Sequence, residues 1–106
     1  MASTAPGLVV RDGTLVVTGA LTFSTVDVAV YERSRALVGD AAVQAVDLSG
    51  VSAADSAGLA LLIEWQSVAR AGGRSLALRG VPAGLRAIAD ISDVEQLIQM
   101  EEAAAR

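Results

Sequence analysis

Three reactive residue types are missing from this 106-residue chain, which contains no cysteine, no histidine and no lysine. Without cysteine there is no disulfide framework and no thiol chemistry. Without histidine the chain lacks the commonest general base and the commonest zinc ligand. The carboxylates are dispersed and show no metal-ligand spacing, and no glycine pattern for a nucleotide is present. We therefore expect no catalytic residues, no metal and no cofactor, and a protein that is not an enzyme.

Positive charge and long apolar runs are also scarce. Twelve acidic residues stand against eight arginines that are scattered singly, so the net charge is −4 and a nucleic-acid partner is not expected. No apolar run approaches the roughly 20 residues that span a bilayer, and the N-terminus has no basic leader. The sequence thus predicts a soluble cytoplasmic protein without direct membrane insertion.

Aromatic residues are limited to one Phe, one Tyr and one Trp, although 53% of the chain is apolar. A single core built from Val, Leu, Ile and Ala is the expected result, because 106 residues are too few for two ordinary domains. We divide the chain into a flexible N-terminus (1–6), one domain (7–100) and a C-terminal tail (101–106).

The first half of the chain predicts a β-hairpin followed by a helix. Two short apolar strands, residues 8–11 and 14–18, flank an Asp-Gly dipeptide, which is a strong hairpin signal. Ser24 and Asp27 have the spacing of an N-cap and its N3 acid, with Phe23 and Val28 placed for a hydrophobic staple. This helix should end at Gly39. Its expected inward side chains are Val26, Val30, Ala36 and Leu37.

The second half alternates strands and helices. We expect a strand at 43–48, a helix at 57–70, a strand in "RSLALRG" and a helix from Pro82 to about residue 90. Ser92 and Glu95 have capping-box spacing for a last short helix. Strands separated by helices favour parallel pairing, so the predicted fold is α/β, a small mixed sheet covered by helices.

The helix after Asp55 shows two apolar sides when it is laid out at 100° per residue. One side, which we expect to face the sheet, contains Leu61, Leu62, Trp65, Val68 and Ala69. The other side contains Ser56, Leu59, Ala60, Ile63, Ser67 and Arg70. Apolar groups on an outward side indicate a partner, so these residues and Asp55 form the predicted docking surface.

Ser56 has three possible roles on the residues alone. As an N-cap it would satisfy a backbone N–H worth roughly 1 kcal/mol, with Asp55 favourably placed at the helix dipole. As a phosphorylation site it would place a phosphate where helix amides accept anions, and the added charge could switch docking off. Nucleophilic catalysis is disfavoured because the chain offers no histidine or lysine base.

The segment "VDLSGVSAADSAGLALL" resembles the signature of STAS domains, in which a strand ends in aspartate and Asp-Ser/Thr-Ala/Ser-Gly-Leu opens a helix. Asp47, Asp55, Ser56, Ala57, Gly58 and Leu59 occupy those positions. The resemblance extends from about residue 7 to 98 and is most specific in this central segment. It implies a STAS-like single domain.

The form "DSAGLALLIEW…AGGRSLALRGV" is most similar to the small STAS subunit of Mla-type ABC transporters, the MlaB group. That resemblance implies a subunit that binds the cytoplasmic ATPase of a phospholipid transporter, and through it the permease complex at the inner membrane, in maintaining outer-membrane lipid asymmetry. The alternative is an anti-sigma factor antagonist whose partner kinase phosphorylates Ser56. The Asp55-Ser56 pair serves both functions equally well.

Overall fold

The computed structural model describes residues 5–91, which contain four strands and three helices. The strands are β1 (Gly7–Arg11), β2 (Thr14–Leu21), β3 (Ala45–Ala54) and β4 (Ala77–Arg79). The helices are α1 (Val28–Gly39), α2 (Ser56–Ala71) and α3 (Ala83–Ile91). The predicted order of elements is confirmed over this range. The helix predicted at Ser92, the domain end at 100 and the tail lie outside the described residues, as does most of the predicted N-terminal segment.

The hairpin between β1 and β2 forms around the Asp-Gly dipeptide, as predicted. Asp12 and Gly13 both adopt left-handed backbone angles, with φ of 52° and 75°, which a tight two-residue hairpin turn requires. Arg11 and Thr14 are therefore directly paired across two antiparallel strands.

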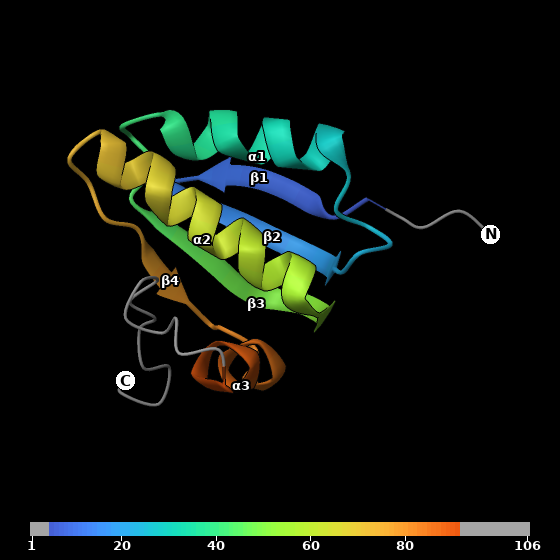
Figure 1. The fold of residues 1–106 in the computed structure, drawn as a ribbon. Coiled ribbons are helices and arrows are strands. Elements are labelled where there is room, and N and C mark those ends of the chain that lie inside the picture. The colour runs from blue at the N-terminus through green and yellow to red at the C-terminus, as the bar shows by residue number, and fades with distance from the viewer. Residues whose placement is uncertain (1–4, 92–106) are drawn as a thin grey trace.

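The four strands form one mixed sheet in the order β1-β2-β3-β4. β1 and β2 are antiparallel, whereas β2–β3 and β3–β4 are parallel. Both parallel connections step in the same direction across the sheet, so α1 and α2 pack side by side over one face (Figure 1). β3 is longer than predicted, because it stays paired with β2 as far as Ala54 through two register shifts.

The start of α1 differs from the prediction. Asp27, not Ser24, is the N-cap, and its Oδ1 accepts a hydrogen bond from the Val30 N–H at 2.9 Å. The preceding residues instead form a turn in which the Thr25 hydroxyl donates to the Ala20 carbonyl at 2.6 Å. Since the helix begins later, the predicted staple does not form, and Phe23 is 74% exposed.

The inward side of α1 was predicted only in part. Val30 is buried and Leu37 is half-buried, as expected, and α1 ends at Gly39. Val26 lies before the helix and is half-buried, whereas Ala36 is exposed and was wrongly assigned to the core.

The core between sheet and helices contains two satisfied polar side chains. Trp65 is fully buried, and its Nε1 donates to the hydroxyl of buried Ser34 on α1 at 2.8 Å. Gln66 donates from Nε2 to the Leu76 carbonyl and accepts from the Leu76 N–H, which ties α2 to the segment before β4. The predicted sheet-facing side of α2 is confirmed. Its residues Leu61, Leu62, Trp65 and Ala69 are buried and Val68 is half-buried.

Candidate functional site: an apolar groove at the start of α2

The first turn of α2 is capped by Asp55 and not by Ser56. The Asp55 Oδ1 accepts a hydrogen bond from the Ala57 N–H at 2.8 Å, while the extended backbone of Asp55 marks it as the residue before the helix. Ser56 is the first helical residue, and it is exposed. The capping role considered for Ser56 is therefore wrong.

Asp55 also connects α2 to the loop between β2 and α1. Its second carboxylate oxygen, Oδ2, accepts a hydrogen bond from the Phe23 N–H at 3.1 Å, and its own N–H donates to the Leu21 carbonyl at 3.2 Å. Two segments more than thirty residues apart in the chain are thus held together by one side chain. The orientation of this loop relative to Ser56 follows from that carboxylate.

Gly58 is required by the close approach of α2 to the end of β2. A Cβ atom at this position would lie 2.8 Å from the Leu21 carbonyl oxygen and 3.1 Å from the Leu21 Cβ. Real Cβ atoms are essentially never found closer than about 3.0 Å to such a neighbour, so an alanine would push the helix away. The Asp-Ser-Ala-Gly segment thereby combines a cap, an exposed hydroxyl and a close contact in four residues.

The predicted docking residues do not all share one exposed surface. Ser56, Ala60, Ser67 and Arg70 are exposed, and Ile63 is half-buried. Leu59 is only 6% exposed and belongs to the core, so its assignment to an outward face is corrected. Its burial follows from the glycine before it, because the short distance between α2 and β2 leaves no solvent beneath the first turn.

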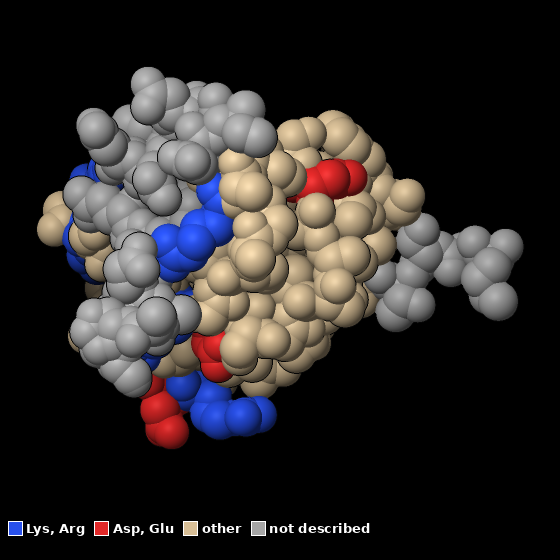
Figure 2. Space-filling model, turned by 90° about the horizontal axis from the view of Figure 1, so that it is seen from below, with Lys and Arg blue, Asp and Glu red and all other residues tan. Residues whose placement is uncertain are grey.

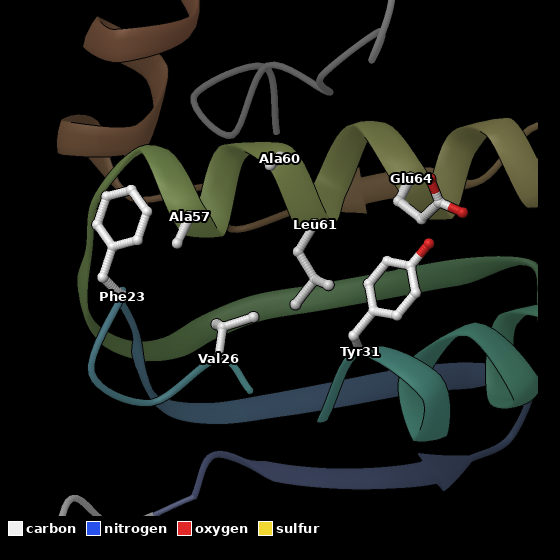
Figure 3. Close-up of a pocket in the computed structure, with 7 residues that line it drawn as sticks. All are labelled: Phe23, Val26, Tyr31, Ala57, Ala60, Leu61 and Glu64. Atoms are coloured by element: carbon white, nitrogen blue, oxygen red, sulfur yellow. The ribbon is translucent and has the colours of Figure 1, made fainter. Parts of the chain in front are cut away.

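An apolar groove lies between the starts of α1 and α2 (Figure 3). Its volume is about 360 Å³, and its walls are formed by Phe23, Val26, Tyr31, Ala57, Ala60, Leu61 and Glu64. Phe23 stands at one end beside Ala57, and Tyr31 stands at the other with its hydroxyl directed toward Glu64 (Figure 3). The groove is open to solvent, since Phe23, Tyr31 and Ala60 are all exposed.

One ion pair closes the Tyr31 end of the groove. Arg35 Nε lies 2.7 Å from Glu64 Oε2, and the guanidinium stands 5.7 Å from the centre of the Tyr31 ring. The hydrogen bond to Glu64 and the nearby Tyr31, Glu64 and Glu32 side chains raise the pKa of Arg35. Both side chains are partly exposed, so the pair adds little to stability.

Asp47, the first aspartate of the motif, lies outside the groove on β3. Its Oδ1 accepts hydrogen bonds from the hydroxyl of Ser49 at 2.7 Å and from the Ser49 N–H at 2.9 Å. These two bonds hold the pKa of Asp47 below its ordinary value. They lie where the pairing of β3 with β2 shifts register between Asp47 and Gly50, and a Cβ at Gly50 would come within 2.8 Å of the Thr18 side chain. Its role is structural.

Sequence reasoning missed the members of the groove that come from outside α2. The sequence predicts Phe23 in a staple and Val26 inside a helix, and it gives no role to Tyr31 or, on α2 itself, to Glu64. The signal available in the sequence was the small number of aromatic residues. The structure buries one of the three, Trp65, and leaves Phe23 and Tyr31 exposed at the groove.

Within residues 5–91 no three His, Cys, Asp or Glu side chains come together as metal ligands, and no helix of that range is long and apolar enough to cross a membrane.

Comparison with known proteins identifies the family. The sequence profile of the MlaB STAS domain matches residues 6–99, and the chain therefore belongs to the STAS domain family. The unphosphorylated form of the anti-sigma factor antagonist SpoIIAA is similar over 82% of this chain and 83% of its own, with 22% identity and a TM-score of 0.54.

A second solved structure confirms the fold. A candidate anti-sigma factor antagonist from Thermotoga maritima is similar over 92% of this chain and 86% of its own, with a TM-score of 0.64 and 10% identity. At these identities the likeness concerns the fold alone. Comparison with curated protein sequences gave no match.

Proposed function

We propose that this chain is a non-enzymatic regulatory and assembly subunit that binds the cytoplasmic ATPase of an Mla-type ABC phospholipid transporter. The observation that carries the proposal is the exposed apolar groove beside Ser56, in a chain matched by the MlaB profile over residues 6–99. The subunit would act in the cytoplasm, held at the inner membrane through the ATPase and permease. Its contribution to outer-membrane lipid asymmetry would come from assembling or activating that complex.

The docking surface in this proposal consists of the exposed start of α2 together with the groove. Ser56 and Ala60 are one turn apart on α2 and both are exposed, so a partner helix could contact the hydroxyl and the small methyl group together. Asp55 contributes by fixing the first turn. Ile63, Ser67 and Arg70 lie further along α2 and would form the edge of the contact.

Co-purification of the chain with an Mla-type ATPase from the same organism tests the proposal. Wild-type chain should elute with the ATPase in size-exclusion chromatography, and Ala60→Arg should not, because the long side chain fills the groove. Ala87→Arg is the matched control, since Ala87 is an exposed alanine on α3 and arginine has nearly the helix propensity of alanine. Absence of any complex with the wild-type chain would refute the proposal.

An anti-sigma factor antagonist is the second candidate, supported by the two structural neighbours and by the exposed hydroxyl of Ser56. A phosphate on Ser56 would stand beside the Asp55 carboxylate and the apolar groove, and its charge would oppose docking. Incubation with a cognate serine kinase and Mg-ATP, followed by intact-mass measurement, tests this function. A mass increase of one phosphate that is lost in Ser56→Ala supports it, and an unchanged wild-type mass excludes it.

A further inference from the structure

Exposed apolar side chains gather at the mouth of the groove. Phe23 is 74% exposed, Val28 is 71% exposed and Tyr31 is 39% exposed. Val28 and Tyr31 are three residues apart on α1 and so lie on the same side of that helix, next to the loop that carries Phe23. Two of the three aromatic residues of the chain, Phe23 and Tyr31, are thus exposed at the two ends of the same groove. A concentration of this kind is typical of a protein–protein contact.

The lining of the groove suits an apolar side chain better than a small-molecule ligand. Val26, Ala57, Ala60 and Leu61 offer only aliphatic surface. Glu64 is the one ionised group in the wall, and it is already paired with Arg35. Small-molecule sites usually add several polar groups that converge on the ligand, and these are not found among the lining residues.

The charges around the groove are mainly negative. Asp55 caps α2 beside the groove, Glu64 lies in the wall, and Glu32 is close enough to Arg35 to raise the pKa of that guanidinium, whereas Arg35 is the cation paired with Glu64. The dipole of α2 offsets part of the charge of Asp55, and Arg35 is the cation placed against Glu32 and Glu64, so these four residues carry more negative than positive charge.

On the face seen in Figure 2, the arginine side chains lie away from the end where α2 begins. In Figure 2 the blue side chains gather at the left, whereas the right-hand end, where β2 and β3 finish and α2 begins, shows one acidic group in an otherwise uncharged surface. A second copy of this chain would bring like charges together at the groove, and the net charge of −4 makes that pairing unfavourable. A basic partner is favoured instead.

We infer that the groove receives a large apolar side chain from a helix of the partner ATPase, and that an arginine or lysine beside that side chain pairs with Glu32 or Glu64. This inference rests on the proposed function and adds the chemistry of the partner surface. Phe23 and Tyr31 close over the inserted side chain from the two ends of the groove. The weak Arg35–Glu64 pair opens to admit the basic group of the partner.

Affinity measurements by calorimetry on purified chain and ATPase test this inference, at two salt concentrations. Phe23→Ala and Tyr31→Ala should each weaken binding at least about tenfold, because aromatic anchors dominate such contacts. Val9→Ala is the matched control, since Val9 is 51% exposed on β1, and its effect should stay below about twofold. Thermal unfolding should show that Phe23→Ala leaves the fold intact, because that side chain is largely in solvent.

The electrostatic part is tested with Glu32→Lys in the same experiment. Wild-type affinity should fall as salt rises, and Glu32→Lys should bind more weakly and lose much of that salt dependence. If the wild-type complex forms but neither aromatic substitution weakens it, or its affinity is independent of salt, the inference is wrong while the proposed function stands. If no complex forms at all, the proposed function fails and this inference fails with it.

Two other occupants of the groove would also overturn the inference. A concentration-dependent dimer in sedimentation experiments that Phe23→Ala abolishes would show that a second copy fills the groove. A lipid-sized mass retained by the purified chain in native mass spectrometry, and lost in Ala60→Arg, would show that a small apolar ligand does. A monomeric chain without bound ligand is the expected result.

Discussion

Replacing Gly58 by alanine is the sharpest test of how α2 is placed, since glycine-to-alanine changes inside helices normally stabilise. Alanine restricts the unfolded chain and has the better helix propensity, which together favour folding by about 0.4–1 kcal/mol. Here the new Cβ would lie 2.8 Å from the Leu21 carbonyl oxygen and 3.1 Å from the Leu21 Cβ, and neither atom belongs to the flexible end of a side chain. Overpacking of this kind costs about 1–3 kcal/mol.

The clash should exceed the gain, so Gly58→Ala should lower the free energy of unfolding by about 1–2 kcal/mol, or roughly 4–15 °C in melting temperature for a domain of this size. Gly84→Ala is the control, because Gly84 lies in α3 and a Cβ there would meet nothing within 4 Å. That variant should be neutral or slightly more stable. Urea unfolding of both variants measures the difference. An equal effect at the two glycines would refute the close approach of α2 to β2.

Two further predictions concern the carboxylates of the motif. Asp55→Ala should lower the free energy of unfolding by about 1–2 kcal/mol, because α2 loses its N-cap, whereas Ser56→Ala should stay within about 0.5 kcal/mol of wild type in the same urea experiment. Asp47→Asn should lower the free energy of unfolding at neutral pH, because the hydrogen bonds from Ser49 stabilise the ionised carboxylate in the folded chain and are absent in the unfolded chain. The folded pKa lies below the ordinary value of 3.8, so the difference between wild type and Asp47→Asn should persist above that pH and vanish as the pH falls through the folded pKa. A difference that is constant down to pH 2, measured by urea unfolding, would contradict this assignment.

The elements that local sequence determines were predicted well. The turn at Asp12-Gly13 requires two residues with positive φ, a requirement visible in the dipeptide itself. The end of α1 at Gly39 and the buried side of α2 around Trp65 likewise follow from glycine punctuation and apolar periodicity. These features depend on neighbours within a few residues, so no knowledge of the tertiary structure was needed.

The two helix starts were misplaced for a tertiary reason. Ser24 and Ser56 are as suitable for capping as Asp27 and Asp55, and propensity alone does not choose between neighbours. At α2 the Phe23 N–H favours Asp55 as the cap, because it donates to the second carboxylate oxygen while the first oxygen caps the helix. A serine offers one hydroxyl oxygen in place of these two acceptor atoms. That contact spans 32 residues and is invisible in a local pattern.

The outward face of α2 was mistaken in part for the same kind of reason. Leu59 was assigned to the outward face because a helical wheel gives only the angle of each residue around the helix axis. It does not show how close each turn of the helix lies to the sheet. In the fold the first turn of α2 is pressed against the end of β2 at Gly58, so the residue after that glycine is covered. The groove was missed because three of its seven lining residues, Phe23, Val26 and Tyr31, come from α1 and the loop before it.

The same contacts determine both the stability of the first turn of α2 and the shape of the groove. Asp55 holds α2 through one carboxylate oxygen and the loop of Phe23 through the other, while Gly58 sets how far α2 stands from β2. The position of Phe23 relative to Ser56 and Ala60 is therefore determined by residues that need not touch a partner. In this chain the aspartate and the glycine of the motif therefore set the geometry of the groove, while Ser56 and Ala60 supply its exposed surface.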